Sequence, residues 1–431
     1  MTSDSSPTLA NLTRVFARIG CLSFGGPAGQ IALMQREIVE QRGWIEQGAF
    51  LRALNLCHLL PGPEAQQLAT WIGWRLHGVR GGLIAGLLFV IPGALVMLAL
   101  SLLYVAATGL GWFAALFLGI KAAVLAIVAQ ALIRVSKRAL GTRFKLVLAG
   151  LAAVLLTWGG VPFPVVILAA GIAGAVVAKW RPAWLGAHHA PSGAAPTTSR
   201  GKLLANTAIM VAVWLGIWAL PLIAVFALLG PDHVLWHIAL FFSRLAIVTF
   251  GGAYAVLAYM AQAAVTGYGW LSPGEMADGL GLAETTPGPL IMVTQFVGFL
   301  AGFRHPGGLT PLTAGLLGAA ITTWVTFAPC FLWIFACAPW MERLEHAERL
   351  QGALAAITAA VVGVIANLAL WFAVHVVFAQ VLPGGMPVWS SLDWRPVLIG
   401  TVAALLLFKF ERGVLQVLVV SALAALGLTL F

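Results

Sequence analysis

The stretch SFGGPAGQ, residues 23–30, has a near copy in TFGGAYAV, residues 249–256. Both copies place an aromatic side chain and two adjacent glycines inside a long apolar segment. A glycine in a helix interior costs roughly 1 kcal/mol relative to alanine, so a pair of glycines favours a break. The two stretches therefore predict two related helices that are interrupted at the same point.

The near copy belongs to a longer internal repeat. A shift of 226 residues places positions 16–63 on positions 242–289 without a gap, with 16 identities in 48 pairs. A later segment, 119–130, matches 356–367 at a shift of 237. Repeats of this length indicate two homologous halves. We expect a first repeat at 12–180, a loop and connector helix at 181–236, and a second repeat at 237–431.

The composition is that of a membrane protein. The chain has 431 residues, of which 61% are hydrophobic and 9% charged, whereas soluble domains carry about 25% charged residues. Runs such as GGLIAGLLFVIPGALVMLALSLLYV, residues 81–105, exceed the roughly 20 apolar residues that cross a bilayer as a helix. These runs are continuous rather than alternating, which favours helices over strands. The fold class is therefore an all-α, polytopic membrane protein in the lipid bilayer.

We expect six spans in each half and one connector between the halves, or about 13 transmembrane helices. They are placed near 12–32, 51–74, 82–107, 112–134, 145–158, 162–179, 203–229, 237–265, 278–302, 310–337, 351–379, 396–409 and 413–431.

The net charge of +10 would suit a nucleic-acid partner, but the basic residues lie in short loops between spans, where they set the orientation. With 13 spans, 15 basic residues lie on the side of the N-terminus and four lie opposite, namely Arg36, Arg42, Arg304 and Arg395. This bias predicts a cytoplasmic N-terminus and an outside C-terminus in a bacterial inner membrane. Seven spans separate equivalent points, which predicts two inverted-topology repeats, an architecture of transporters.

The breaks are the predicted substrate site. Each half also contains a Pro-Gly-Pro, which removes amide donors and excludes helical geometry before each proline. Such breaks persist in a membrane only where they are buried in protein or line a cavity, and the free amides of a half-helix attract anions. The alternative is that the glycines only let helices pack closely. The residues of the predicted site are Ser23, Phe24, Gly25, Gly26, Pro61, Gly62, Pro63, Thr249, Phe250, Gly251, Gly252, Pro287, Gly288 and Pro289.

Three basic residues inside the predicted spans are further substrate-binding candidates. Lys121 lies roughly ten residues from either end of its span, and Arg18 and Arg244 occupy matching positions of the two repeats. Charges inside a membrane are expensive and mark functional sites, although a long side chain near a span end can extend to the interface. No carboxylate lies one turn from Lys121 on its own helix. We expect its partner to be a bound dianion or, failing that, Glu64 or Glu284.

Three residues near the Pro-Gly-Pro segments are candidates for proton coupling. Glu64 directly follows the first segment, Glu284 precedes the second, and His58 matches Glu284 in the repeat. All three can titrate, but an acid at the first turn of a helix is also an ordinary cap.

The sequence offers no metal site and no cofactor site. Its four cysteines, Cys21, Cys57, Cys330 and Cys337, all lie in apolar segments without the spacing of zinc ligands or of a disulfide framework.

Taken together, the motifs resemble those of the chromate ion transporter family, in its long, two-domain form. The shared features are FxRIGxxSFGGP with EIVEQRGWI, then LLPGP, then FxRLxxVTFGG, GYGWL and TTPGP in the second half, and the span GIKAAVLAIVAQ. The resemblance covers nearly the whole chain.

The resemblance implies two fused antiparallel halves and export of chromate, an oxyanion similar to sulfate, driven by protons or the membrane potential. It implies transport rather than enzymatic activity; a homodimer is compatible with it. Ala253 stands where the first repeat has Pro27, so we expect the halves to contribute unequally. Three alternatives stay open: a permease for sulfate or another oxyanion, an anion channel, and a lipid-acting membrane enzyme, for which no catalytic constellation is seen.

Overall fold

The computed structural model describes residues 7–24, 26–186, 200–250, 253–345, 347–382 and 385–430. Within them the chain is almost entirely helical, and its β-structure is confined to two isolated bridges. The first half comprises α1 (Leu9–Leu22), α2 (Gly26–Met34), η1 (Gln35–Glu40), α3 (Gln47–Leu59), α4 (Glu64–Ala107), α5 (Gly111–Ala139), α6 (Arg143–Thr157) and α7 (Phe163–Trp180). The connector comprises η2 (Pro182–Leu185) and α8 (Arg200–Leu229).

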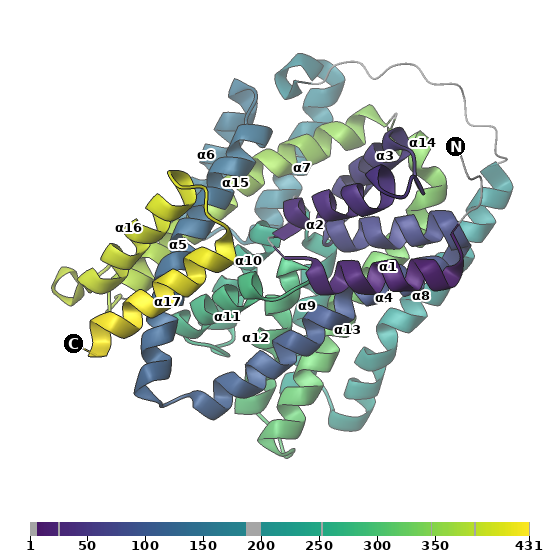
Figure 1. Ribbon diagram of the computed structural model, residues 1–431. Helices are drawn as coiled ribbons and strands as arrows, with labels where there is room; N and C mark the ends of the chain where they lie inside the picture. Colours follow the sequence, from purple (N-terminus) through teal and green to yellow (C-terminus); the bar gives the residue numbers. More distant parts are fainter. Residues whose placement is uncertain are drawn as a thin grey trace.

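The second half begins with α9 (Val234–Val248), α10 (Ala253–Gln262), η3 (Ala263–Gly267), α11 (Pro273–Thr285), η4 (Leu290–Met292) and α12 (Val293–Arg304). It continues with α13 (Pro311–Cys337), η5 (Ala338–Trp340), α14 (Met341–Glu345), α15 (Glu348–Val377), η6 (Trp389–Ser391), α16 (Trp394–Phe408) and α17 (Val414–Leu430) (Figure 1).

The all-α, polytopic membrane fold is confirmed. Six of the described helices are long and apolar enough to cross a membrane: α4, α5, α7, α8, α13 and α15. Shorter apolar helices, among them α9, α16 and α17, complete the bundle.

The internal repeat is visible in the backbone. Each half has a π-helix, η1 or η3, at the same place, followed by a glycine with positive φ, Gly43 at 62° and Gly269 at 64°. The next residue then donates a backbone hydrogen bond back to the π-helix, Trp44 to Ile38 and Trp270 to Ala264, at 2.9 and 2.8 Å. The two halves therefore share a conformation as well as a sequence pattern.

Four of the expected spans are not continuous helices. The segments 12–32 and 237–265 are divided after Ser23 and Thr249, and the segments 51–74 and 278–302 are divided at the two Pro-Gly-Pro stretches. The breaks fall where paired glycines and prolines disfavour the helix. The expectation of broken helices is thus confirmed.

In the second half each broken pair returns to the end at which it began. Phe241, in α9, packs on Tyr268 and Trp270, which follow η3, with ring centroids 5.5 and 5.7 Å away. A continuous helix would separate residues 241 and 268 by about 40 Å. At the end of α12, Arg304 donates to the Glu275 carboxylate at the start of α11, with Nη1–Oε2 at 2.7 Å. The expected spans at 237–265 and 278–302 are therefore hairpins rather than crossings.

The first half follows the same pattern. Phe16, Ile38 and Ile45 share one apolar cluster, and their repeat equivalents Phe242, Ala264 and Leu271 share another. The second pair of this half ends in α4, where His77 and Gly78 leave helical geometry and Gly78 takes a φ of 60°. Within the described residues, these contacts favour returning pairs at four of the thirteen expected spans. Two hairpins per half would leave the side of the next helix unchanged, and the orientation of the chain ends stays a prediction.

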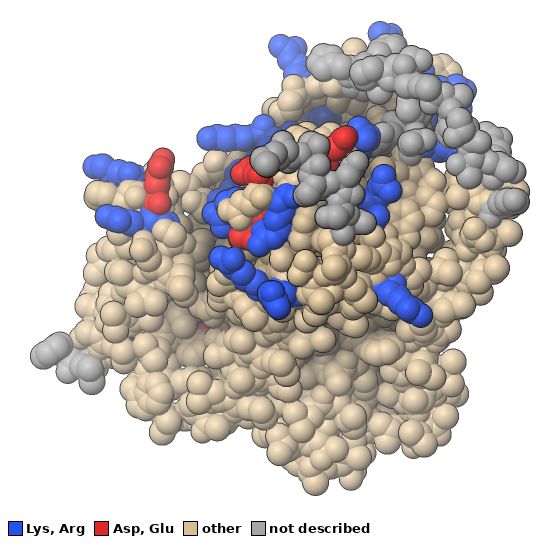
Figure 2. Space-filling view, turned by 45° about the vertical axis from the view of Figure 1, so that its right-hand side comes forward, with Lys and Arg blue, Asp and Glu red and all other residues tan. Residues whose placement is uncertain are grey.

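Returning pairs would make the predicted charge bias stronger. A returning first pair would put Arg36 and Arg42 on the side of the N-terminus and leave only Arg304 and Arg395 opposite. In Figure 2 the Lys and Arg side chains gather over one end of the visible face, and the other end is nearly free of charge.

Candidate functional site

Each half uses its Pro-Gly-Pro to hold the glycine break of the other half. The Gly62 amide donates to the Thr249 carbonyl, and the Gly288 amide donates to the Ser23 carbonyl, both at 2.9 Å. The two bonds are equivalent under the repeat, because 226 residues separate Ser23 from Thr249 and Gly62 from Gly288. We call the Ser23–Gly288 pair the first junction and the Thr249–Gly62 pair the second junction.

The glycines of the Pro-Gly-Pro segments make these junctions possible. Gly62 and Gly288 have φ angles of 117° and 85°, a region that side chains with a Cβ rarely adopt. Both segments are buried, including Pro61, Pro63, Pro287 and Pro289. Gly93 of α4 lies against the second segment, since a Cβ there would be 2.4 Å from the Pro287 carbonyl oxygen.

The hydroxyl groups of Ser23 and Thr249 donate hydrogen bonds to the last turn of the helix that precedes each break. The Ser23 hydroxyl donates to the Ile19 carbonyl at 2.6 Å, and the Thr249 hydroxyl donates to the Leu245 carbonyl at 2.5 Å. Both residues are buried. Their hydroxyl oxygens keep the capacity to accept, but their protons are not free for an anion in this conformation.

At each junction one glutamine of the first repeat donates a hydrogen bond to a carbonyl of the Pro-Gly-Pro segment. Gln30 donates to the Gly288 carbonyl at 2.6 Å, and Gln67 donates to the Pro61 carbonyl at 2.6 Å. Both side chains are fully buried, and their Oε1 atoms have no hydrogen-bond partner among the described residues. Their repeat equivalents are Val256 and Val293, so the two halves contribute unequally to the junctions. Sequence reasoning missed these glutamines, although an amide inside a membrane span was a usable signal.

The breaks also bring together the amino ends of half-helices. The first junction joins the start of α2 to the turn that leads into η4 and α12, and the second joins the start of α4 to the break before α10. Gly26 opens α2 with a φ of 71°, and no atom of the described residues lies within 4 Å of where a Cβ would stand. Gly25, Gly251 and Gly252 belong to the same predicted site and lie outside the described residues.

The outer flank of the first break is open. Phe24 is 42% exposed, and Arg18 one and a half turns earlier is exposed as well. Arg244 has the same exposed setting on α9, and Phe250 is half-buried. The two arginines thus lie on the surface of their half-helices rather than inside the junctions, and no ion pair in the described part of the chain involves them.

Lys121 has a carboxylate partner that the sequence analysis did not find. Its Nζ lies 3.2 Å from Oδ1 of Asp278 in α11, and the Tyr104 hydroxyl of α4 donates to Oδ2 of Asp278 at 2.8 Å. The side chain of Asp278 is 5% exposed and that of Lys121 is 24% exposed. We call these three residues the Lys121–Asp278–Tyr104 cluster. The sequence analysis named Glu64 and Glu284 as the first carboxylates to examine, whereas the structure pairs Lys121 with Asp278; a bound dianion at Lys121 stays a prediction.

This cluster is separate from the junctions. Lys121 is ten residues from the start of α5 and 18 from its end, so it lies toward one end of the span rather than at the centre. Its Nζ reaches the first turn of α11, where a Cβ on Gly274 would be 3.2 Å away. The break at the other end of α11 is about 12 Å further along from Asp278. The structure therefore does not join Lys121 to the Pro-Gly-Pro segments.

The proton-coupling candidates occupy three different settings. Glu64 is half-buried in the first turn of α4, His58 is exposed in the last turn of α3, and Glu284 is buried and partnered in α11. The structure brings none of them into the Lys121–Asp278–Tyr104 cluster. Asp278 was missed because it stood at the very start of an expected span. Its mismatch with Arg52 in the repeat was the signal that could have found it.

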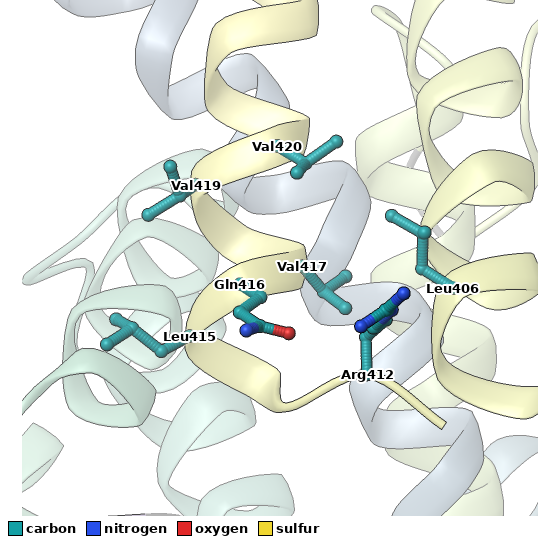
Figure 3. A pocket seen from close by; sticks show the side chains of 7 residues that line it. All are labelled: Leu406, Arg412, Leu415, Gln416, Val417, Val419 and Val420. Carbon is teal, nitrogen blue, oxygen red and sulfur yellow. The ribbon is translucent and has the colours of Figure 1, made fainter. Parts of the chain in front are cut away.

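Two surface hollows are poorer candidates. The hollow in Figure 3 lies where α16 ends and α17 begins, and aliphatic side chains surround its two polar residues, the exposed Arg412 and Gln416. A second hollow of about 310 Å³ lies at the end of the second-half hairpins, between His233, His237 and His305. Neither reaches the junctions, and no group of side chains in the described residues could hold a metal ion.

Two repeats of broken helices, interlocked by their own backbone inside a helical bundle, define a multi-pass membrane protein with the build of a transporter. The chain belongs to the chromate transporter family, because the model of that family matches residues 10–175 and 236–428.

Curated relatives resemble the chain over nearly its whole length. A chromate transport protein of Pseudomonas aeruginosa is 31% identical over 98% of this chain and 94% of its own. One from Cupriavidus metallidurans is 29% identical over the same shares, 98% and 94%. A probable chromate transport protein of Synechococcus elongatus is 29% identical over 97% and 95%. No solved structure matches the chain.

Proposed function

We propose that this protein carries chromate outward across a bacterial inner membrane, as a transporter rather than an enzyme. The observation that carries the proposal is the pair of reciprocal junctions, Gly62 with Thr249 and Gly288 with Ser23, in a chain whose relatives are named chromate transport proteins. Breaks of this kind in both halves point to the binding site of a transporter.

The oxyanion binds where half-helices begin beside the junctions. The amino end of each half-helix offers free amides and a partial positive charge, which suit a tetrahedral dianion. The predicted glycine pairs leave room for the anion against the backbone. Arg18 and Arg244, exposed on the helices that lead to the breaks, draw the anion toward them.

Alternating access follows from the inverted relation of the halves. We take the helices α4 to α8 as five crossings between the first pair of hairpins and the second, and an odd number of crossings reverses the orientation. The basic bias puts the N-terminus in the cytoplasm and the C-terminus outside. Rocking one repeat against the other would open the junction region first to one side and then to the other.

The test is flux of labelled chromate and of labelled sulfate in everted vesicles, with and without a proton gradient. We expect chromate to accumulate in vesicles that contain the protein, and Gly25→Leu and Gly251→Leu to abolish the flux while the protein still inserts. Accumulation of sulfate alone would identify a sulfate permease. Equilibration without accumulation under any gradient would identify a channel, and no flux of either anion would refute the proposal.

A further inference from the structure

The Lys121–Asp278–Tyr104 cluster surrounds a carboxylate, that of Asp278. The Lys121 ammonium lies against the first turn of α11, whose amino end carries a partial positive charge of its own. The Lys121 ammonium and the amino end of α11 repel each other, and a negative group between them offsets that repulsion. In this conformation the negative group is Asp278, one turn into the same helix.

Among the described residues, one carboxylate oxygen of Asp278 accepts a hydrogen bond and the other does not. Oδ2 receives the Tyr104 hydrogen bond, whereas Oδ1 lies 3.2 Å from the Lys121 ammonium and receives no hydrogen bond of good geometry from the described residues. A buried carboxylate oxygen with this setting can take a proton without breaking a hydrogen bond. Protonation on Oδ1 removes the charge that neutralises Lys121.

The other acids on and around α11 are engaged elsewhere or lie apart. Glu284 is six residues beyond Asp278 on α11 and has an interaction of its own. Glu275, one turn before Asp278, is paired with Arg304 of α12 and hydrogen-bonded to Ser272. Of the other helices packed on α11, α4 contributes Tyr104 and α17 contains no ionisable residue. The ionisable residues of α15, Glu348, Arg349 and His375, lie near its two ends.

We propose that Asp278 is a proton-binding site and that its protonation frees Lys121 to bind the transported oxyanion at a second position on its path, apart from the junctions. The inference rests on the proposed function. A dianion at Lys121 leaves the cluster with two net negative charges if Asp278 is ionised and with one if Asp278 is protonated. The proton comes from water through the partly exposed Lys121 side, stays on Oδ1 while the anion is bound, and returns to water when the anion leaves.

This linkage has a consequence for the direction of coupling. Because the proton and the oxyanion stabilise the same loaded state, each raises the affinity for the other. They therefore cross the membrane in the same direction, which is symport rather than exchange of a proton for an anion. Outward transport would then be driven by the membrane potential, since the loaded site still carries net negative charge.

The experiment measures chromate affinity of the full-length protein in detergent across the alkaline pH range, where chromate is a dianion throughout. We expect affinity to fall by about tenfold per pH unit, because one proton is taken up per anion. Asp278→Asn should bind chromate without this slope, and Asp278→Glu should keep it. The matched control is Glu275→Gln, which removes a paired acid one turn away and should leave the slope unchanged.

A second measurement needs no variant. Chromate added to the wild-type protein in weakly buffered solution should remove about one proton from the solvent per anion bound. Chromate binding without proton uptake, or an unchanged slope in Asp278→Asn, would overturn the proposal and leave the transport function standing. No chromate binding by the wild type would instead refute the proposed function.

Discussion

Gly93 is the residue on which the packing of the second Pro-Gly-Pro depends, and replacing it by alanine tests the junction directly. A Cβ at this position would lie 2.4 Å from the Pro287 carbonyl oxygen, about 1 Å closer than ordinary contact. The blocking atom is backbone of a buried segment, so it cannot rotate away as a side chain would. Either α4 or the Pro-Gly-Pro must move.

We expect Gly93→Ala to cost about 1–3 kcal/mol through overpacking. Because the displaced segment contains the Gly288 amide, the cost falls on the first junction, and it corresponds to roughly a 5- to 150-fold change in the population of the intact conformation. Thermal unfolding in detergent and chromate flux in everted vesicles should both decrease. The matched control is Gly216→Ala in α8, where no atom lies within 4 Å of the added Cβ.

The comparison separates the clash from helix propensity. Alanine is intrinsically better in a helix than glycine by roughly 1 kcal/mol at both positions, so the control should be as stable as the wild type or more so. If Gly93→Ala matches Gly216→Ala in both unfolding temperature and flux, the close approach of α4 to the second Pro-Gly-Pro contributes to neither stability nor transport. That result would refute the role of Gly93 in the first junction.

Three further predictions follow from the same geometry. Gly62→Ala and Gly288→Ala should each lower the free energy of unfolding by about 1–2 kcal/mol, because both glycines have positive φ. Thermal unfolding measures the loss, with Gly150→Ala as the control at an open position. Equal stability of the three variants would show that alanine is not strained at Gly62 and Gly288. Gln41→Cys, in a cysteine-free background, should react with an impermeant thiol reagent from the side of the N-terminus, whereas labelling from the opposite side would restore the thirteen-crossing topology. Lys121→Met and Asp278→Asn should each destabilise the protein, and the double variant should recover about 0.5–3 kcal/mol of coupling; additive losses would show that the ion pair contributes nothing.

Much of the fold could be predicted because its signals are local. Glycine pairs and Pro-Gly-Pro stretches act on the backbone at the residues where they stand, so the breaks near Ser23 and Thr249 could be located from the sequence. Hydropathy, by contrast, reports how apolar a segment is and not whether the chain reverses within it. The hairpin of α9 and α10 is as apolar as a crossing helix, and only contacts such as Phe241 with Tyr268 show that it returns.

The candidate site could be predicted only in part, because its contacts join residues far apart in the chain. The breaks were recognised, but the pairing of each break with the Pro-Gly-Pro of the other half depends on how the halves interlock. Lys121 was recognised from its place in a span, whereas its partner lies 157 positions away on a half-helix. No periodicity within one helix contains that information.

The duplicated backbone and the unduplicated side chains have separate roles. The junctions recur in both halves because each needs only a glycine amide at positive φ and the backbone carbonyl of Ser23 or Thr249. The ionic cluster does not recur, because the repeat positions of Lys121 and Asp278 hold Thr358 and the exposed Arg52. In the proposed mechanism, the duplicated scaffold opens to either side, and a charged site built from unmatched residues would give the two openings different affinities for an anion and a proton. Such a difference would let a proton-linked carrier bind its oxyanion on one side and release it on the other.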